Sequence, residues 1–213
     1  MTVNKIILFS GGIDSTILAL QHAISLNNEK ALLLHIDYDH PAKEAEKLAS
    51  LLIYRKLISY YDDTFEYQSL YLPINAQSMN IGNGNTGSRV VPNRNAIMLN
   101  MAINVAVCNG ANVIQYGAVL DDVADYVDCR PEFLKKINSI ADDWNVRIEA
   151  PLMDVAKDEI FHDSNRIVID VLSCCSSCYQ PLKINNNYVA CGTCNSCISN
   201  GIQKGDQIVM AIS

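Results

Sequence analysis

The chain has 213 residues, of which 49% are hydrophobic and 18% are charged, and its formal net charge is −7. This composition excludes a disordered or fibrous chain and fits one α/β domain of ordinary size with a small appendage. The negative charge and the scattered lysines and arginines argue against RNA or DNA as the main substrate. No apolar stretch reaches the length of a membrane span and no basic-then-apolar leader precedes residue 5, so we expect a cytoplasmic protein with no membrane partner.

A glycine-containing turn lies close to the N-terminus. Residues 6–9 form an apolar run that predicts a buried strand, and residues 17–24 form a second run that predicts a helix. Between them lie Ser10, Gly11, Gly12, Asp14 and Ser15. The backbone N–H groups of such a strand-to-helix turn and the helix dipole favour an anion, and the serine hydroxyls add donors. The stretch therefore predicts a phosphate site, in which Asp14 holds Mg²⁺.

Two familiar phosphate-binding motifs do not match this turn. The Walker motif needs a lysine after its last glycine, and none follows Gly12. The dinucleotide motif needs a third glycine, which is absent. The sequence S-G-G-x-D-S resembles instead the pyrophosphate loop of the ATP pyrophosphatase superfamily, whose members adenylate a substrate oxygen. The alternative is a plain glycine turn.

The rest of the chain predicts an α/β fold with a doubly wound parallel sheet. Strands are expected at residues 30–37, 65–72, 113–119, 146–150 and 166–171, and helices at 42–56, from about 93 to 108, 131–144 and 154–161. Residues 75–89 are rich in Gly, Asn and Ser, and are either a lid over the nucleotide or an insertion. We expect a nucleotide-binding domain at 1–172 and a cysteine-rich segment at 173–213.

Polar residues gather where two of these elements begin or end. Asn93 or Asn95 is a candidate cap for the helix that follows. Arg94 falls in the first turn of that helix, where a cation is unfavourable, so we expect an anionic partner for it. The strand at 113–119 ends in a cluster of polar residues, namely Asp121, Asp122, Asp125, Tyr126, Asp128, Cys129 and Arg130. Ligands of open α/β sheets bind beyond the carboxyl ends of strands, so this cluster is a predicted substrate site.

Four cysteines near the C-terminus have metal-ligand spacing. Cys178, Cys191, Cys194 and Cys197 form C-x12-C-x2-C-x2-C. Four thiolates make the closed tetrahedral set of a structural zinc site, although the spacing alone leaves an iron–sulfur cluster open.

The other cysteines and two histidines allow only simpler expectations. Cys174 and Cys175 remain as possible exchange ligands for the metal, Cys129 has a predicted packing or hydrogen-bonding role, and Cys108 is predicted to be a core residue. His35 is expected to be structural, and His40 to lie near a ligand.

Four signatures together resemble the 7-cyano-7-deazaguanine synthase family. They are the loop at residues 10–15, V-P-N-R-N at 91–95, D-Y-V-D-C-R at 125–130, and S-C-Y at 177–179 with C-G-T-C-N-S-C at 191–197. P-L-M at 151–153 with K-D-E at 157–159 also fits the family. The resemblance spans nearly the whole chain in the same order.

The resemblance implies an ATP-dependent ligase. ATP would adenylate the carboxylate of 7-carboxy-7-deazaguanine, ammonia would displace AMP to give the amide, and a second ATP would convert the amide into the nitrile. It also implies a structural Zn²⁺ on the four cysteines, a homodimer, and roles in catalysis or substrate binding for Asp14, Asn93, Arg94, Asp128 and Arg130.

The chemistry of the substrate suggests which residues bind it. A deazaguanine ring presents two parallel donors, which one carboxylate can accept, and Asp121, Asp125 and Asp128 are the candidates. The carboxylate of the substrate needs a cation, which Arg94 or Arg130 would supply.

Some positions depart from the family pattern. Asp39, His40, Pro41 and Ala42 follow Tyr38 in place of the family's Gln and His, and Val127 replaces the proline of Y-P-D-C-R. Isoleucine 198 stands where the family has an arginine after the last cysteine. These departures affect positions at which the family is expected to contact its substrate. An enzyme that releases the amide as its final product is therefore the alternative. The rival readings are a tRNA-modifying adenylating enzyme and a nucleotide-binding zinc protein without catalysis.

Overall fold

A computed structural model describes residues 2–25, 29–75, 91–120, 126–155, 165–185, 187–199 and 201–209. Three predicted features lie wholly or mostly outside these ranges: the segment 75–89, the acidic residues 121–125, and the helix at 154–161. No helix in the described part of the chain is long and apolar enough to cross a membrane.

A five-stranded parallel sheet forms the centre of the molecule, which confirms the predicted fold class. Its strands are β1 (Val3–Leu8), β2 (Lys30–Asp39), β3 (Phe65–Asn75), β4 (Val113–Gln115) and β5 (Arg147–Glu149), in the order β3-β2-β1-β4-β5. In the central strand Ile6 is paired with Leu32 on one side and Ile114 on the other. The strands are apolar on both faces because helices cover both faces.

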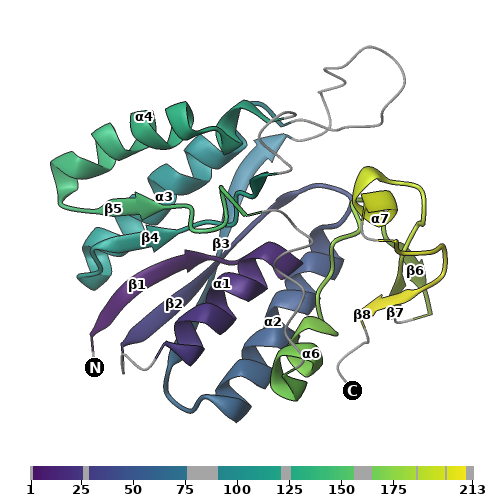
Figure 1. The fold of residues 1–213 in the computed structure, drawn as a ribbon. Coiled ribbons are helices and arrows are strands. Elements are labelled where there is room, and N and C mark those ends of the chain that lie inside the picture. Colours follow the sequence, from purple (N-terminus) through teal and green to yellow (C-terminus); the bar gives the residue numbers. More distant parts are fainter. Residues whose placement is uncertain are drawn as a thin grey trace.

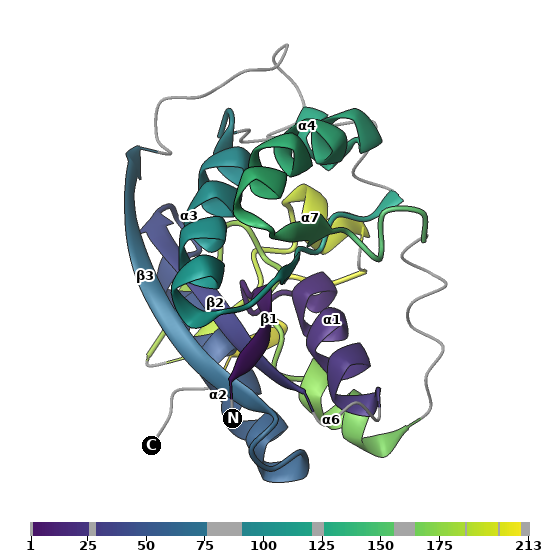
Figure 2. The ribbon, with the colours of Figure 1, turned by 90° about the vertical axis from the view of Figure 1, so that its left-hand side faces the viewer.

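Helices flank the sheet on two sides (Figures 1 and 2). On one face α1 (Ile13–Ile24), α2 (Lys43–Tyr60) and α6 (Arg166–Leu172) bury residues such as Leu18, Ile53 and Val171 against Ile7 and Leu33. On the other face α3 (Arg94–Asn109) and α4 (Pro131–Ala141) enclose a second apolar cluster. The carboxyl ends of the parallel strands therefore open at one edge, between the two helical layers.

Two predictions from the sequence were wrong. Residues 166–171 were expected to be a strand but belong to helix α6, where the side chain of Asn165 accepts a hydrogen bond from the Ile167 N–H and caps the first turn. Val168 and Val171 lie on one face of that helix and are buried. Cys108 was expected in the core but is exposed, because α3 turns Ala102 and Ala106 inward instead.

The cysteine-rich segment forms a small unit of its own. Three antiparallel strands, β6 (Leu182–Ile184), β7 (Asn187–Val189) and β8 (Gln207–Val209), adjoin the short helix α7 (Asn195–Ser199). The unit, coloured yellow to green in Figure 1, lies beside the upper end of α2. The sequence reading did not predict these strands, whose three-residue length leaves no clear alternation.

Candidate active site

The predicted phosphate loop connects β1 to α1, as its glycines suggested. Gly11 has φ of +85°, and a Cβ at this position would lie 2.7 Å from the backbone nitrogen of Ser50 in α2. A side chain here would therefore be strained and would collide with backbone. Gly12 is the N-cap of α1 and makes no side-chain cap bond, so the first turn presents N–H groups at the positive end of the helix dipole.

Serine and threonine hydroxyls hold this loop in shape. The Ser15 and Thr16 hydroxyls both donate to the carbonyl oxygen of Gly12, at 3.0 and 2.8 Å. The Ser10 Oγ accepts from the Gly12 N–H at 3.2 Å and lies 3.2 Å from the Ser15 Oγ. The loop is therefore arranged before any anion binds.

A third glycine, which sequence reasoning missed, brings β4 against this loop. A Cβ on Gly117 would lie 3.1 Å from the Asp14 Cβ and 3.2 Å from the Ser15 nitrogen. Only glycine allows this approach without a shift of the loop. The signal in the sequence is a single glycine inside the predicted strand at 113–119.

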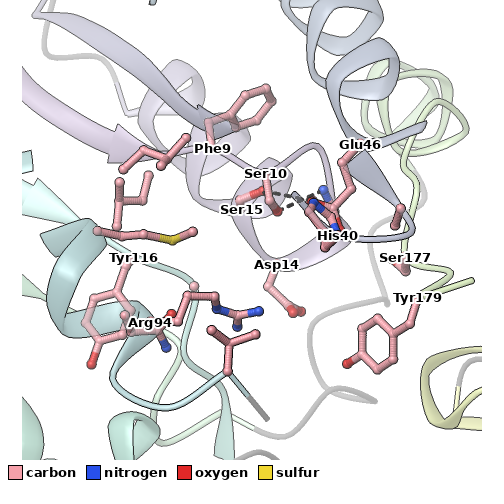
Figure 3. Close-up of a pocket in the computed structure, with 18 of the residues that line it drawn as sticks. Phe9, Ser10, Asp14, Ser15, His40, Glu46, Arg94, Tyr116, Ser177 and Tyr179 are labelled. Carbon is pink, nitrogen blue, oxygen red and sulfur yellow. Dashed lines mark hydrogen bonds and ion pairs between the residues drawn. The ribbon is translucent and has the colours of Figure 1, made fainter. Parts of the chain in front are cut away.

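A cavity of about 330 Å³ opens at this edge of the sheet, within the size range of small-molecule sites. Eight residues from the predicted phosphate loop, Arg94 and the predicted polar cluster line it: Ser10, Gly12, Asp14, Ser15, Arg94, Tyr126, Asp128 and Cys129. Gly11, Asn93 and Arg130 lie outside its lining, and Asp121 and Asp125 lie outside the described residues. Figure 3 shows Asp14 near the middle, with Arg94 and Tyr116 on one side and His40 and Glu46 on the other.

Arg94 begins α3 and is directed into the cavity. Its guanidinium donates a 3.0 Å hydrogen bond to the hydroxyl of Tyr38. Burial opposes the charge of Arg94, but Tyr38, Glu46 and Asp128 together raise its pKa above the ordinary value. The cation expected from the sequence thus stays charged in the cavity.

Asp128 lies in a short 3-10 helix, Val127–Cys129, and lines the cavity. One carboxylate oxygen accepts from the Asn95 N–H at 3.4 Å, in the first turn of α3. Asp128 therefore contributes to the N-terminus of α3, where a negative charge is favourable. Asn93 occupies the N-cap with φ of +61° but makes no side-chain cap bond.

His40 and Glu46 form a pair on the opposite wall. The His40 Nε2 lies 3.5 Å from a Glu46 carboxylate oxygen, and the His40 ring stacks on Tyr38 with centroids 4.2 Å apart. Burial, reinforced by Arg94, lowers the pKa of His40 to about 4, and burial raises the pKa of Glu46 to about 7. His40 thus lies near a ligand cavity, as predicted, whereas Glu46 was missed because nothing in its helix distinguishes it.

Two buried hydroxyls of the cavity lining have no hydrogen-bond partner among the described residues. They are the Tyr116 OH and the Ser176 Oγ, on residues that are 4% and 2% exposed. The backbone N–H of Ser176 donates to the Gly11 carbonyl oxygen at 2.9 Å. This bond connects the phosphate loop to the segment that leads into the cysteine cluster.

The four cysteines of the C-terminal segment come together as predicted. The Sγ atoms of Cys178, Cys191, Cys194 and Cys197 lie within 4.8 Å of one another and could bind a metal ion. Burial opposes ionisation of Cys191, but N–H donors of Thr193 and Cys194 lower its pKa to about 6, which favours the thiolate. Gly192, with φ of +70°, lies so close to Lys204 that a side chain could not fit.

The remaining cysteines and His35 lie apart from this cluster. The Cys175 thiol lies 3.3 Å from the Thr16 hydroxyl, and burial raises its pKa to about 12. Cys174 packs beside the α1 and α2 layer. Cys129 is buried in the wall of the cavity. His35 is buried with its Nδ1 3.0 Å from the Phe9 carbonyl oxygen, which agrees with a structural role.

Comparison with known proteins identifies similar chains along nearly the whole length. The family model described as "Queuosine biosynthesis protein QueC" matches residues 4–201. A 7-cyano-7-deazaguanine synthase of Marinobacter nauticus is 32% identical over 209 residues, covering 93% of this chain and 90% of the relative. The 7-cyano-7-deazaguanine synthase 1 of Colwellia psychrerythraea is 32% identical over 207 residues, covering 92% and 91%.

The fold also resembles the solved structure of an enzyme that is named for a different reaction. The U34-tRNA thiolase NcsA of Methanococcus maripaludis, solved with its [4Fe-4S] cluster, has a TM-score of 0.53 at 16% identity. The match covers 85% of this chain and 60% of the thiolase. At this identity the likeness concerns the fold alone.

Proposed function

Because the chain belongs to the QueC family, we propose that it converts 7-carboxy-7-deazaguanine into 7-cyano-7-deazaguanine with ATP and ammonia. The observation that carries this proposal is that one cavity joins a phosphate loop to a buried cation and a carboxylate. Ser10 and Ser15 lie at the loop end, and Arg94 and Asp128 at the other. Such a cavity offers partners for phosphate groups at one end and for an acidic substrate at the other.

The loop end suits the pyrophosphate part of ATP. The first turn of α1 and the hydroxyls of Ser10 and Ser15 would hold the β- and γ-phosphates, and the Asp14 carboxylate would hold Mg²⁺. Mg²⁺ would neutralise charge on the leaving pyrophosphate. Donors that are fixed in advance stabilise this charge as it develops.

The end of the cavity at Arg94 suits the carboxylate of the substrate. The Arg94 guanidinium would orient the carboxylate of the substrate so that one oxygen attacks the α-phosphorus of ATP and pyrophosphate leaves. Ammonia then attacks the acyl carbon, loses a proton and displaces AMP, which gives the amide. The amide oxygen attacks a second ATP, pyrophosphate leaves and the amide nitrogen loses one proton; loss of AMP and of the second nitrogen-bound proton then leaves the nitrile.

Mass spectrometry of products tests this proposal. Purified protein is incubated with 7-carboxy-7-deazaguanine, ATP, Mg²⁺ and an ammonium salt, and the nitrile is expected with AMP and pyrophosphate. A matched reaction with the Asp14→Asn variant should form neither the nitrile nor AMP. Formation of ADP and phosphate without AMP would contradict the proposal.

The residues after Tyr38, which differ from the family pattern, suggest one alternative product, the amide. His40 and Pro41 replace the family pattern beside Arg94, so the amide has different neighbours here. An enzyme that releases the amide would consume the acid but leave synthetic amide and ATP unchanged. Conversion of that amide into a product lighter by one water, with AMP, supports the full reaction.

We propose Zn²⁺ as the metal of the cysteine cluster. Tetrahedral bonds of about 2.3 Å to one zinc ion place sulfurs about 3.7 Å apart. The Cys191 and Cys197 Sγ atoms lie 4.0 Å apart. An iron–sulfur cluster would stand between its thiolates and hold them farther apart. Zinc would hold the segment together, because its apolar cluster is small.

A further inference from the structure

The hydroxyl of Tyr116 is one of two buried hydroxyls, on described residues of the cavity lining, that the proposed reaction leaves unused. Tyr116 follows β4, and its backbone N–H donates to the Glu149 carbonyl oxygen at 3.1 Å. Its ring belongs to the apolar cluster under α3 and α4, which holds the side chain in place. The residue is 4% exposed, and its hydroxyl has no partner among the described residues.

An unpaired buried hydroxyl lowers stability, so its presence calls for a ligand that pairs with it. Burial, with the nearby Cys129 and Asp128, raises the pKa of Tyr116 above its ordinary value. The hydroxyl therefore keeps its proton and remains a donor at neutral pH. Asp128, whose charge acts on this hydroxyl, also lines the cavity and offers carboxylate oxygens there.

A hydroxyl donor and a carboxylate that line the same cavity match one edge of a guanine-type ring. That edge presents a carbonyl oxygen, then the ring N–H, then the exocyclic amine. An adenine-type edge presents an amine and an unprotonated ring nitrogen, which a carboxylate repels. A donor and a carboxylate that both reach one bound ring would thus select a 6-oxo ring with a 2-amino group.

We propose that the Tyr116 hydroxyl donates a hydrogen bond to the ring carbonyl oxygen of the deazaguanine substrate, while Asp128 accepts from the ring N–H and the amine. This inference rests on the proposed function and adds a residue that sets ring specificity. Tyr116 holds the substrate and takes no part in the transfer of the adenylyl group.

Equilibrium binding without ATP or ammonia tests the inference apart from catalysis. Calorimetry compares 7-carboxy-7-deazaguanine with its 6-deoxo analogue, which lacks the carbonyl oxygen and with it the ring N–H, on the wild type and on Tyr116→Phe; the comparison that counts is between the two proteins for each ligand. The wild type should bind the substrate about tenfold or more tightly than the variant does. The 6-deoxo analogue should bind both proteins within about twofold, since it cannot accept the bond.

Thermal unfolding and a matched variant complete the test. Tyr116→Phe should be as stable as the wild type or more stable, because it loses an unpaired donor. Tyr54→Phe removes a hydroxyl from a tyrosine that packs on Tyr67, away from the cavity lining, and should leave binding unchanged. An equal substrate Kd in wild type and Tyr116→Phe overturns the inference, as does an equal loss of affinity for both ligands.

The binding measurements, taken together with the mass spectrometry of products, separate this inference from the proposed function. Tight binding that depends on Tyr116, without formation of amide or nitrile, would contradict the proposed function alone. Product formation with an unchanged Kd in Tyr116→Phe would contradict the inference alone. A wild type that does not bind the substrate would overturn both.

Discussion

The guanidinium of Arg94 donates a 3.0 Å hydrogen bond to the hydroxyl of Tyr38, which ties the start of α3 to the end of β2. The Tyr38 ring in turn stacks on His40, next to Glu46. One buried cation is thus held in a fixed direction by groups from two neighbouring elements. A guanidinium whose orientation is fixed in this way can orient a substrate carboxylate that binds to it.

Replacement of Arg94 should therefore damage turnover more than folding. We expect Arg94→Lys to lower kcat/KM about tenfold and Arg94→Ala to lower it further, because lysine keeps the charge but loses the planar fork. Steady-state kinetics with the acid as varied substrate measure this. Arg147→Lys is the matched control, since that arginine is largely exposed and pairs with Glu149 on β5. Equal effects of the two lysine variants would argue against a substrate role for Arg94.

The pKa values of His40 and Glu46 predict opposite effects of pH on stability. Burial raises the pKa of Glu46 from 4.5 to about 7, so the folded protein keeps a proton that the unfolded chain loses. Its contribution to stability therefore falls as the pH rises from about 4.5 to 7. Burial lowers the pKa of His40 from 6.5 to about 4, so its contribution rises with pH between these values.

Denaturant unfolding of two variants separates these contributions. Relative to the wild type, Glu46→Gln should gain stability between about pH 4.5 and 7, and its advantage should be constant above that range. His40→Gln should lessen the loss of stability below pH 6.5. Glu44→Gln, an exposed position in the same helix, corrects for the loss of one carboxylate. A stability difference between Glu46→Gln and wild type that does not change with pH would contradict the assignment.

The metal centre should be necessary for the shape of the C-terminal segment. Metal analysis should give about one zinc per chain, and Cys194→Ser should be poorly soluble or sensitive to protease. Cys108→Ser is the matched control, because that cysteine is exposed and lies outside the cluster. A brown protein with visible absorption would indicate an iron–sulfur cluster instead.

The Ser176 hydroxyl should contribute to nucleotide binding. Ser176 is buried against Gly11 and Gly12, and its Oγ has no partner among the described residues. We expect Ser176→Ala to raise the KM for ATP about tenfold without loss of stability, since the hydroxyl would pair with a phosphate oxygen. Ser139→Ala, on the exposed face of α4, should leave this KM unchanged. A lower melting temperature with an unchanged KM would assign Ser176 a structural role only.

Local patterns in the sequence predicted the features that depend on neighbouring residues. The phosphate loop at residues 10–15 and the cysteine cluster are both defined by spacing within a short stretch. The β-branched run at 166–171 misled the prediction, because its helix depends on the Asn165 cap and on burial against α1 and α2. Tertiary contact thus overrode local propensity at this segment.

Residues brought together from distant parts of the chain were beyond local patterns. Glu46, Tyr116 and Ser176 come from three separate segments of the chain, and all three line the cavity. Each is an ordinary residue within its own segment, and its burial or lack of a partner depends on the whole fold. Gly117 could have been found from the sequence, because a glycine within a strand pattern often marks a close approach of two backbones.

Transfer of labelled oxygen tests the adenylation of the carboxylate most directly. The substrate is made with both carboxylate oxygens as the heavy isotope, and the AMP formed is examined by mass spectrometry. The proposed reaction predicts that every AMP carries one heavy oxygen, with two labelled AMP molecules for each nitrile, or one for each amide if the reaction stops there. Unlabelled AMP, or ADP and phosphate as the only nucleotide products, would contradict the account.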